Sequence, residues 1–260
     1  MKERLLRLFV FVLLITLLTA FMAIPAYSAP GDDLIGGGTG SIEPNLQVNI
    51  NGEGSDTVRI LVLMTVLMLL PSILIMMTSF VKIIIVFSLL RHAVGIQQTP
   101  PNQVLVGLAL FLTLFIMRPV IADINQNAYI PYAEGRISST EFIETASDPL
   151  RVFMLGETRI DDLQMFYSIS GEEMPANQNE YNMLVVIPSF ILSEIRSAFT
   201  IGFLLFIPFL IIDMVVSSAL MSMGMMMLPP ITISLPFKLM LFVLVDGWGL
   251  LIRALVSTYT

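Results

Sequence analysis

The sequence lacks the residues that most often bind metals or carry out thiol chemistry. It contains no cysteine and a single histidine, His92, so neither a Cys-x-x-Cys pair nor a His-Glu-x-x-His motif can be written from it. Zinc hydrolases, haem proteins and thiol enzymes are therefore excluded, and we expect no metal and no cofactor. A nucleotide-binding GxxxxGK[ST] loop is also absent, so we expect no nucleotide hydrolysis by this chain. We expect a protein that is not an enzyme.

Charged residues are scarce and apolar residues are abundant. Only 13% of the 260 residues are charged and 56% are hydrophobic, which gives a mean hydropathy of +0.86. This apolar content exceeds what one soluble core of this length can bury, so the surplus must face lipid or other subunits. The net charge of −7 argues against nucleic-acid binding, which normally presents a basic face to phosphates.

The N-terminus has the pattern of a secretory signal peptide. Basic residues open the chain, an apolar stretch follows from Leu8 to Ala20, and a small-residue site ends at Ser28. We predict a signal peptide over residues 1–28, with an uncleaved first membrane helix as the alternative. Residues 29–56 combine glycines with acidic and polar residues, which predicts a flexible extracytoplasmic linker.

Apolar regions long enough to cross a membrane fill much of the remaining chain, since a spanning helix needs about 20 residues. Strand patterns are nearly absent, so we expect an all-α integral membrane protein built of helical hairpins, one over residues 57–121 and one over residues 184–260. The first region is too long for one crossing and must protrude, kink at Pro71 or fold back near Lys82. The apolar regions are residues 58–90, 102–121, 184–228 and 231–255.

Between the hairpins lies a polar segment, residues 122–183, in which eleven acidic residues outnumber three arginines. Loops retained in the cytoplasm are rich in Lys and Arg. Lys82 and Arg91 therefore favour a cytoplasmic turn inside the first hairpin and place residues 122–183 outside. Enough apolar residues remain there to form a small helical extracytoplasmic segment.

Charged residues inside the apolar regions carry the main functional signal. Each costs about 2.5 to 3.5 kcal/mol at the centre of a membrane helix, so they must be paired, hydrated or near the interface. Snorkelling to the interface and pairing both stay open for Lys82 and Arg118. For five others we predict ion pairs between helices or between subunits, with a proton relay as the alternative for the carboxylates: Glu194, Arg196, Asp213, Lys238 and Asp246.

Methionines crowd the residues before a Leu-Pro-Pro sequence. Methionine is flexible and polarizable, so a ring of such residues from several subunits can close around a variable object and reopen. Ordinary gap filling in a helical hairpin and a Cu(I) site remain alternatives. The cluster surrounds Gly224 and comprises Met221, Met223, Met225, Met226 and Met227.

Several stretches, in the right order over about residues 58–258, resemble the FliP/SctR family. The longest are residues 188–199 (PSFILSEIRSAF) and 236–248 (PFKLMLFVLVDGW). Shorter ones are MTSF at 77–80, LLR at 89–91, TPPNQV at 99–104, GLALFLT at 107–113, FIPFLIID at 206–213 and GMMM at 224–227.

The resemblance implies a pore subunit of the type III export gate in the bacterial inner membrane, at the flagellar basal body. It implies a pentameric ring together with FliQ and FliR, adjoining FlhB and FlhA, through which unfolded flagellar proteins pass. It also implies that Met225, Met226 and Met227 form a gasket in the pore, and that the apolar helices lie largely above the bilayer plane. The signal peptide and the polar segment resemble the flagellar branch more than the injectisome branch.

Two other functions stay open from the residues alone. An ion channel or transporter could use Asp213 and Asp246 as coupling sites. An intramembrane hydrolase could use the same two carboxylates as a pair, although no GxGD motif is present. The sequence also offers no paired nucleophile and base for such a hydrolase.

Overall fold

The structure is a computed structural model that describes residues 54–96, 99–177, 180–225 and 228–259. The predicted signal peptide and nearly all of the predicted linker lie outside these residues. The chain divides into two compact units, Met1–Pro71 and Ser72–Thr260. In the first unit the described residues form the start of helix α2, whose apolar side chains from Ile60 to Leu70 are exposed.

The described residues are helical and contain no strand, which confirms the predicted all-α class. The helices are α2 (Gly54–Met76), α3 (Phe80–Val94), α4 (Asn102–Ile116), α5 (Arg118–Ile124), the π-helix η1 (Asn125–Tyr129), α6 (Ile130–Ala133), α7 (Ser139–Glu157), α8 (Ile160–Ser170), α9 (Met183–Ser222), α10 (Pro230–Leu244) and α11 (Gly247–Ser257).

By length and composition, α9 alone among the described helices can cross a membrane as a single unbroken element. Up to four spans result if each bent pair of helices is counted as one. These pairs are α2 with α3, α4 with α5–α6, and α10 with α11, the last two bent by 56° and 62°.

Helix α9 is longer than a membrane crossing requires. Its 40 residues extend about 60 Å at about 1.5 Å per residue. The helix continues through Pro188 and Pro208, although each proline removes a backbone hydrogen bond. The first apolar region likewise does not end at Pro71: α2 runs through it, and the break to α3 lies at residues 77–79.

Local signals set several of the helix ends. The Ser138 hydroxyl accepts the Glu141 N–H at 3.2 Å and the Asn182 side chain accepts the Leu184 N–H at 3.0 Å, which satisfies donors at the starts of α7 and α9. Helix α3 ends at Gly95, whose φ of 90° is accessible to glycine at little cost.

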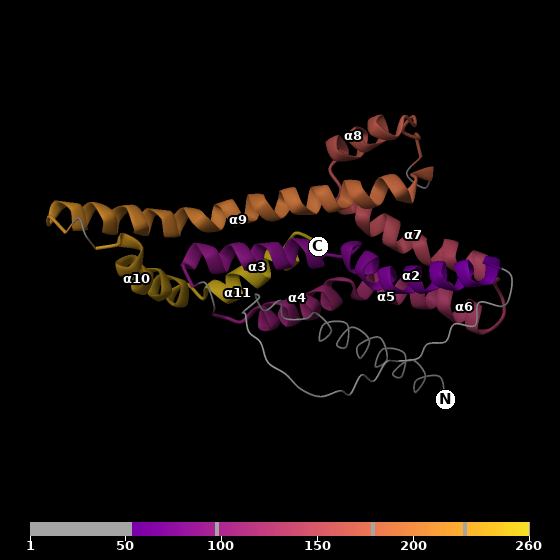
Figure 1. Ribbon diagram of the computed structural model, residues 1–260, viewed down its shortest axis with the longest axis horizontal. Helices are drawn as coiled ribbons and strands as arrows, with labels where there is room; N and C mark the ends of the chain where they lie inside the picture. Colours follow the sequence, from indigo (N-terminus) through magenta and orange to yellow (C-terminus); the bar gives the residue numbers. More distant parts are fainter. Residues whose placement is uncertain (1–53, 97–98, 178–179, 226–227, 260) are drawn as a thin grey trace, which may run out of the picture. The chain divides into compact units, whose positions relative to one another are not determined.

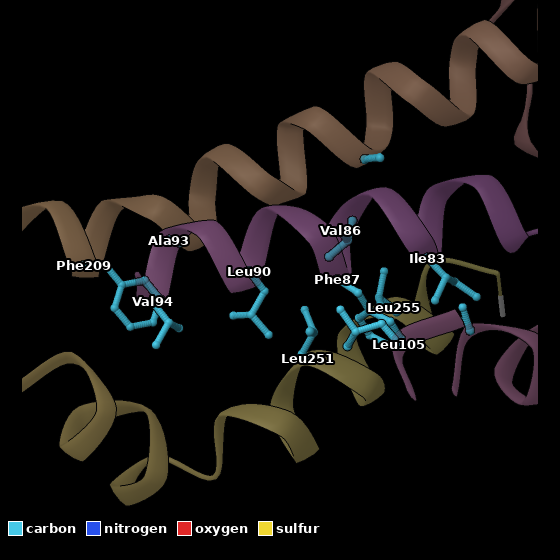
Figure 2. Packing of buried hydrophobic residues seen from close by; sticks show 12 residues of the cluster. Ile83, Val86, Phe87, Leu90, Ala93, Val94, Leu105, Phe209, Leu251 and Leu255 are labelled. Carbon is cyan, nitrogen blue, oxygen red and sulfur yellow. The ribbon is translucent and has the colours of Figure 1, made fainter. Parts of the chain in front are cut away.

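One hydrophobic core surrounds α3, which packs along α9 and is covered on its other sides by α4, α10 and α11 (Figure 2). Phe87 is completely buried and its ring meets Trp248 of α11 edge to face, with centroids 6.0 Å apart. The members are Ile83, Val86, Phe87, Leu90, Ala93, Val94, Leu105, Ala109, Ala198, Phe209, Leu251 and Leu255.

A second core joins the N-terminal part of α9 to α7 and α8, which lie beside that end of the long helix (Figure 1). Its buried members are Met77, Met154, Leu163, Tyr167, Tyr181, Val185, Val186 and Phe190. Helix α9 therefore carries two cores in succession along its length. The acidic segment is attached to the second core, at the N-terminal part of α9, and the hairpin formed with α10 lies at the other end of α9 (Figure 1).

Large apolar side chains remain exposed on the outer faces of α4, α9 and α10. Phe111 is 74% exposed, Phe203 68% and Leu244 76%. Soluble monomers rarely expose contiguous apolar surface on this scale, so these faces suit lipid or other subunits.

We predict that Gly202→Ala destabilises the packing of α3 on α9. A Cβ at Gly202 would lie 2.2 Å from Leu89 Cδ1 and 3.2 Å from Leu89 Cβ, so α9 must move or Leu89 must rotate, which costs about 1 to 3 kcal/mol. The matched control is Gly107→Ala in α4, where no atom lies within 4 Å and alanine favours the helix. Thermal unfolding of the purified chain measures both, and equal melting temperatures would contradict the close approach.

Candidate functional site

A buried cluster of charges lies where α3, α7 and α9 meet. The Lys82 ammonium, in the first turn of α3, lies 2.8 Å from Glu194 Oε1 of α9 and 3.1 Å from Glu157 Oε2 at the end of α7. Lys82 is 2% exposed and Glu194 is completely buried. Since a charge taken out of water is costly unless it is paired, each member requires the others in place.

The end of the chain completes this cluster. The Tyr259 hydroxyl donates a hydrogen bond to Glu194 Oε2, and the Lys82 ammonium lies 4.0 Å from the centroid of the Tyr259 ring, a cation–π contact. Burial, with the Glu194 charge as a smaller cause, raises the pKa of the Tyr259 phenol well above its usual range. The hydroxyl therefore stays protonated and remains a donor to the carboxylate.

A second cluster of polar side chains joins α8 to α9. On α9 it involves Ser193 and Arg196, which lie on either side of Glu194 in the sequence. Asp162, in the first turn of α8, is 1% exposed. Its two oxygens accept hydrogen bonds from the Ser193 hydroxyl at 2.8 Å and from Arg196 Nη2 at 2.9 Å. The Arg159 N–H donates in turn to the Ser193 hydroxyl at 3.0 Å, so the start of α8 is held on α9 by a connected polar network.

A third cluster joins α9 to α10 and α3. The buried Lys238 ammonium lies 2.6 Å from Asp213 Oδ2 and 3.4 Å from the Ala93 carbonyl oxygen at the end of α3. The Ser234 hydroxyl donates to the other Asp213 oxygen at 2.5 Å. Three helices of the first core are thereby linked through one ion pair.

Asp246 differs from the other charges because its partner is local and exposed. Arg253 Nη2, on the same helix α11, lies 3.2 Å from Asp246 Oδ2, and both side chains are more than 70% exposed. Asp246 has a left-handed backbone with φ 50°. A Cβ at Gly249 would lie 2.2 Å from Asp246 Oδ2, so any other residue there would displace the exposed Asp246 side chain.

The structure thus gives each of the five predicted charges a partner within the chain, while pairing between subunits stays a prediction. Sequence reasoning placed Glu194 and Arg196 apart, and they do contact different helices. It did not identify Glu157, Asp162 or Tyr259 as partners. The first two belong to the acidic segment, where a solvated role is the ordinary expectation, and the sequence carries no signal that distinguishes Tyr259.

The methionine cluster begins at Met221 in the last turn of α9 and continues into the residues that precede α10. Met221, Met223 and Met225 are exposed, and Gly224 between them has φ 77°. Met226 and Met227, the other two predicted gasket residues, lie outside the described residues. The gasket role of the three methionines therefore stays a prediction.

Comparison with known proteins extends over most of the chain. A sequence model of the FliP family matches residues 63–255. The chain is 50% identical over 205 residues to the flagellar biosynthetic protein FliP of Bacillus subtilis, covering 79% of this chain and 93% of that protein. It is 49% identical over 220 residues to that of Aquifex aeolicus, covering 83% and 92%.

Similarity to the flagellar biosynthetic protein FliP of Buchnera aphidicola subsp. Acyrthosiphon pisum is 51% identity over 220 residues, or 83% of this chain and 58% of that protein. The match to the flagellar biosynthetic protein FliP of Buchnera aphidicola subsp. Baizongia pistaciae covers 56% of that protein. The chain therefore spans little more than half the length of these two relatives.

We predict that Tyr259→Phe and Tyr259→Leu destabilise the chain to different extents. Phenylalanine keeps the ring beside Lys82 but removes the donor to Glu194, which costs about 1 to 3 kcal/mol when a buried acceptor is left unsatisfied. Leucine also removes the cation–π contact, worth about 0.5 to 2 kcal/mol more. Melting temperatures in mild detergent should fall in that order, with the exposed Tyr129→Phe as an unchanged control. A wild-type melting temperature for both Tyr259 variants would show that the contacts of Tyr259 with Glu194 and Lys82 do not stabilise the chain.

We also predict that Lys238→Met is more damaging than Arg253→Met. Loss of Lys238 leaves Asp213 without its cation in a largely buried setting, where we expect a cost of about 2 kcal/mol after allowing for the partial exposure of Asp213. The Arg253 pair is exposed, so its loss should change stability by less than about 1 kcal/mol. Thermal unfolding of the two variants compares the sites directly, and similar losses would show that burial does not decide their strength.

Proposed function

Since the chain belongs to the FliP family, we propose that it is a pore-forming core subunit of the flagellar type III protein export gate and passes unfolded flagellar proteins across the inner membrane. The match over residues 63–255 carries this proposal, because it includes α3 to α10 and the methionine loop. The name flagellar biosynthetic protein FliP, which the compared relatives share, supports it.

The subunit acts within a pentameric ring of identical copies. This ring assembles with FliQ and FliR, and the resulting complex adjoins FlhB and FlhA. The exposed apolar faces of α4, α9 and α10 support this assembly, because they offer surface that a partner helix can bury. The polar contacts of Lys82 and Lys238 are satisfied within the chain, which leaves apolar packing as the main contribution of those faces.

The protein is a multi-pass component of the bacterial inner membrane at the flagellar basal body. Its signal peptide, residues 1–28, directs the N-terminus out of the cytoplasm, and residues 122–183 lie on the same side. The apolar α9 and the bent helix pairs support membrane insertion. The acidic segment is held to the N-terminal part of α9 through Asp162, so both belong at one end of the subunit.

The methionine loop forms the seal of the pore. Met225 is exposed at the turn after α9, where a ring of copies can bring the loops together, and Met226 and Met227 follow directly. Flexible thioether side chains can close around chains of different sequence. The subunit is not an enzyme, and the energy for transport comes from partner proteins or the membrane potential.

Mass analysis of the intact assembly tests this function. The tagged chain is co-expressed with the products of the neighbouring genes and purified in mild detergent. The mass of the intact complex is then measured. A multimer that contains FliQ-like and FliR-like subunits is expected. A lone monomer or a simple homodimer would contradict the export-gate proposal and favour a channel or transporter, which should then conduct without those partners.

We predict that replacing Met225, Met226 and Met227 together by alanine preserves assembly but opens a leak. Shorter side chains cannot fill the constriction, so membranes that carry the variant complex should pass small ions or solutes. Met165→Ala on α8, an exposed methionine far along the chain from the loop, is the matched control and should stay tight. A sealed membrane with the triple variant in an intact complex would refute the gasket.

A further inference from the structure

The buried cluster around Lys82 carries more negative than positive charge. The Lys82 ammonium lies 2.8 Å from Glu194 Oε1 and 3.1 Å from Glu157 Oε2, so two carboxylates share one cation. The Tyr259 hydroxyl that completes the cluster is protonated and neutral. Because Glu194 is completely buried and the Glu157 side chain is 18% exposed, the surplus negative charge reaches the surface at Glu157.

The neighbouring charges do not balance this surplus, because they are paired with each other. Arg159, which closely follows Glu157 in the sequence, lies 3.4 Å from Asp161 Oδ2. Arg196 lies 2.9 Å from Asp162 Oδ1. Within the part of the chain that the structure describes, the junction of α3, α7 and α9 therefore keeps one uncompensated carboxylate at its open edge.

Arg118 presents the opposite imbalance and is the exception to the internal pairing of charges. Among the basic residues whose side chains the structure describes, it alone makes neither a hydrogen bond nor an ion pair. It is exposed at the start of α5, between the exposed apolar residues Phe115 and Ile121. A partner helix that covers this face would bury an unpaired guanidinium, which is costly unless the partner supplies a carboxylate.

Arg118 and Glu157 lie at similar heights on the subunit. The helical run α5–η1–α6 turns back at residues 134–138, and α7 returns along it, packed against η1 and α5. Arg118 and Met154 are equally far in sequence from Arg136, at the centre of this turn. Arg118 is therefore level with the last turn of α7, which ends at Glu157. No ion pair joins the two residues within the chain, since Glu157 is paired with Lys82.

We propose that Arg118 of one copy pairs with Glu157 of the neighbouring copy, as a polar contact that sets the register between subunits. This inference rests on the ring of identical copies proposed above. Rotation about a ring axis that runs along the helices keeps every residue at its own height, so residues that meet across a head-to-tail interface must be level. Arg118 and Glu157 meet this condition, and each supplies the charge that the other lacks.

The chain contains no cysteine, so introduced cysteines can report which residues meet. Copies with Arg118→Cys and copies with Glu157→Cys, carrying different tags, are co-expressed with the FliQ-like and FliR-like subunits proposed above. The purified complex is treated with a short bismaleimide, and a cross-linked product that carries both tags is expected. The matched control uses Arg136→Cys, an exposed arginine in the turn before α7, in place of Arg118→Cys and should give no such product.

A double-mutant cycle measures the charge pairing in the same complex. Arg118→Gln and Glu157→Gln should each raise about tenfold the concentration at which the purified complex is half dissociated, since each removes one partner of a pair between subunits. The double variant should be no weaker than the weaker single variant. Arg136→Gln is the matched control and should leave this concentration unchanged, because Arg136 is exposed and paired with Glu134 of its own chain.

A complex that assembles without the two-tag product, or in which the effects of the two glutamine variants add, would overturn the pair and leave the export-gate proposal in place. Cross-linking of Arg118→Cys to a FliQ-like or FliR-like subunit instead would show that the neighbour is not a second copy, which also contradicts the inference. If the unaltered chain forms no multimer, the proposed function itself is wrong, and the pair between copies falls with it.

Discussion

The buried ammonium of Lys82 is the constraint on which the rest of the structure depends. A charge removed from water costs several kcal/mol unless partners surround it, so Glu194, Glu157 and Tyr259 must all reach one point. These residues come from α3, α7, α9 and the chain end. One charge thereby fixes how four distant parts of the sequence meet and where the two hydrophobic cores join.

Because the charges are satisfied internally, the outer faces of the helices remain apolar. Lys238 and Asp213 repeat this arrangement farther along α9, and the large apolar side chains of Phe203 and Phe111 remain exposed on the outer faces. Such a subunit can pack against identical copies or lipid without paying for further charge burial. This is the property that the proposed export gate requires, with the methionine loop presented at the end of the longest helix.

Hydropathy was sufficient to predict the all-α class and the approximate apolar regions, because long apolar runs without alternation leave few other solutions. It did not predict that α9 runs unbroken through Pro208, because a proline inside a helix removes a backbone hydrogen bond and often kinks or ends the helix. The need of Glu194 and Arg196 for partners followed from the cost of charge in an apolar helix. The identities of Glu157 and Asp162 did not, because these contacts join residues 75 and 34 positions apart and depend on the tertiary fold.

A double-mutant cycle on Lys82 and Glu194 tests the central claim most directly. Lys82→Met alone leaves two carboxylates without their cation and should lower the free energy of unfolding by about 3 to 5 kcal/mol. Adding Glu194→Leu removes the fully buried carboxylate, so the double variant should be more stable than Lys82→Met. If the two changes instead add, so that the double variant is the least stable of the set, the buried ion pair does not organise this fold.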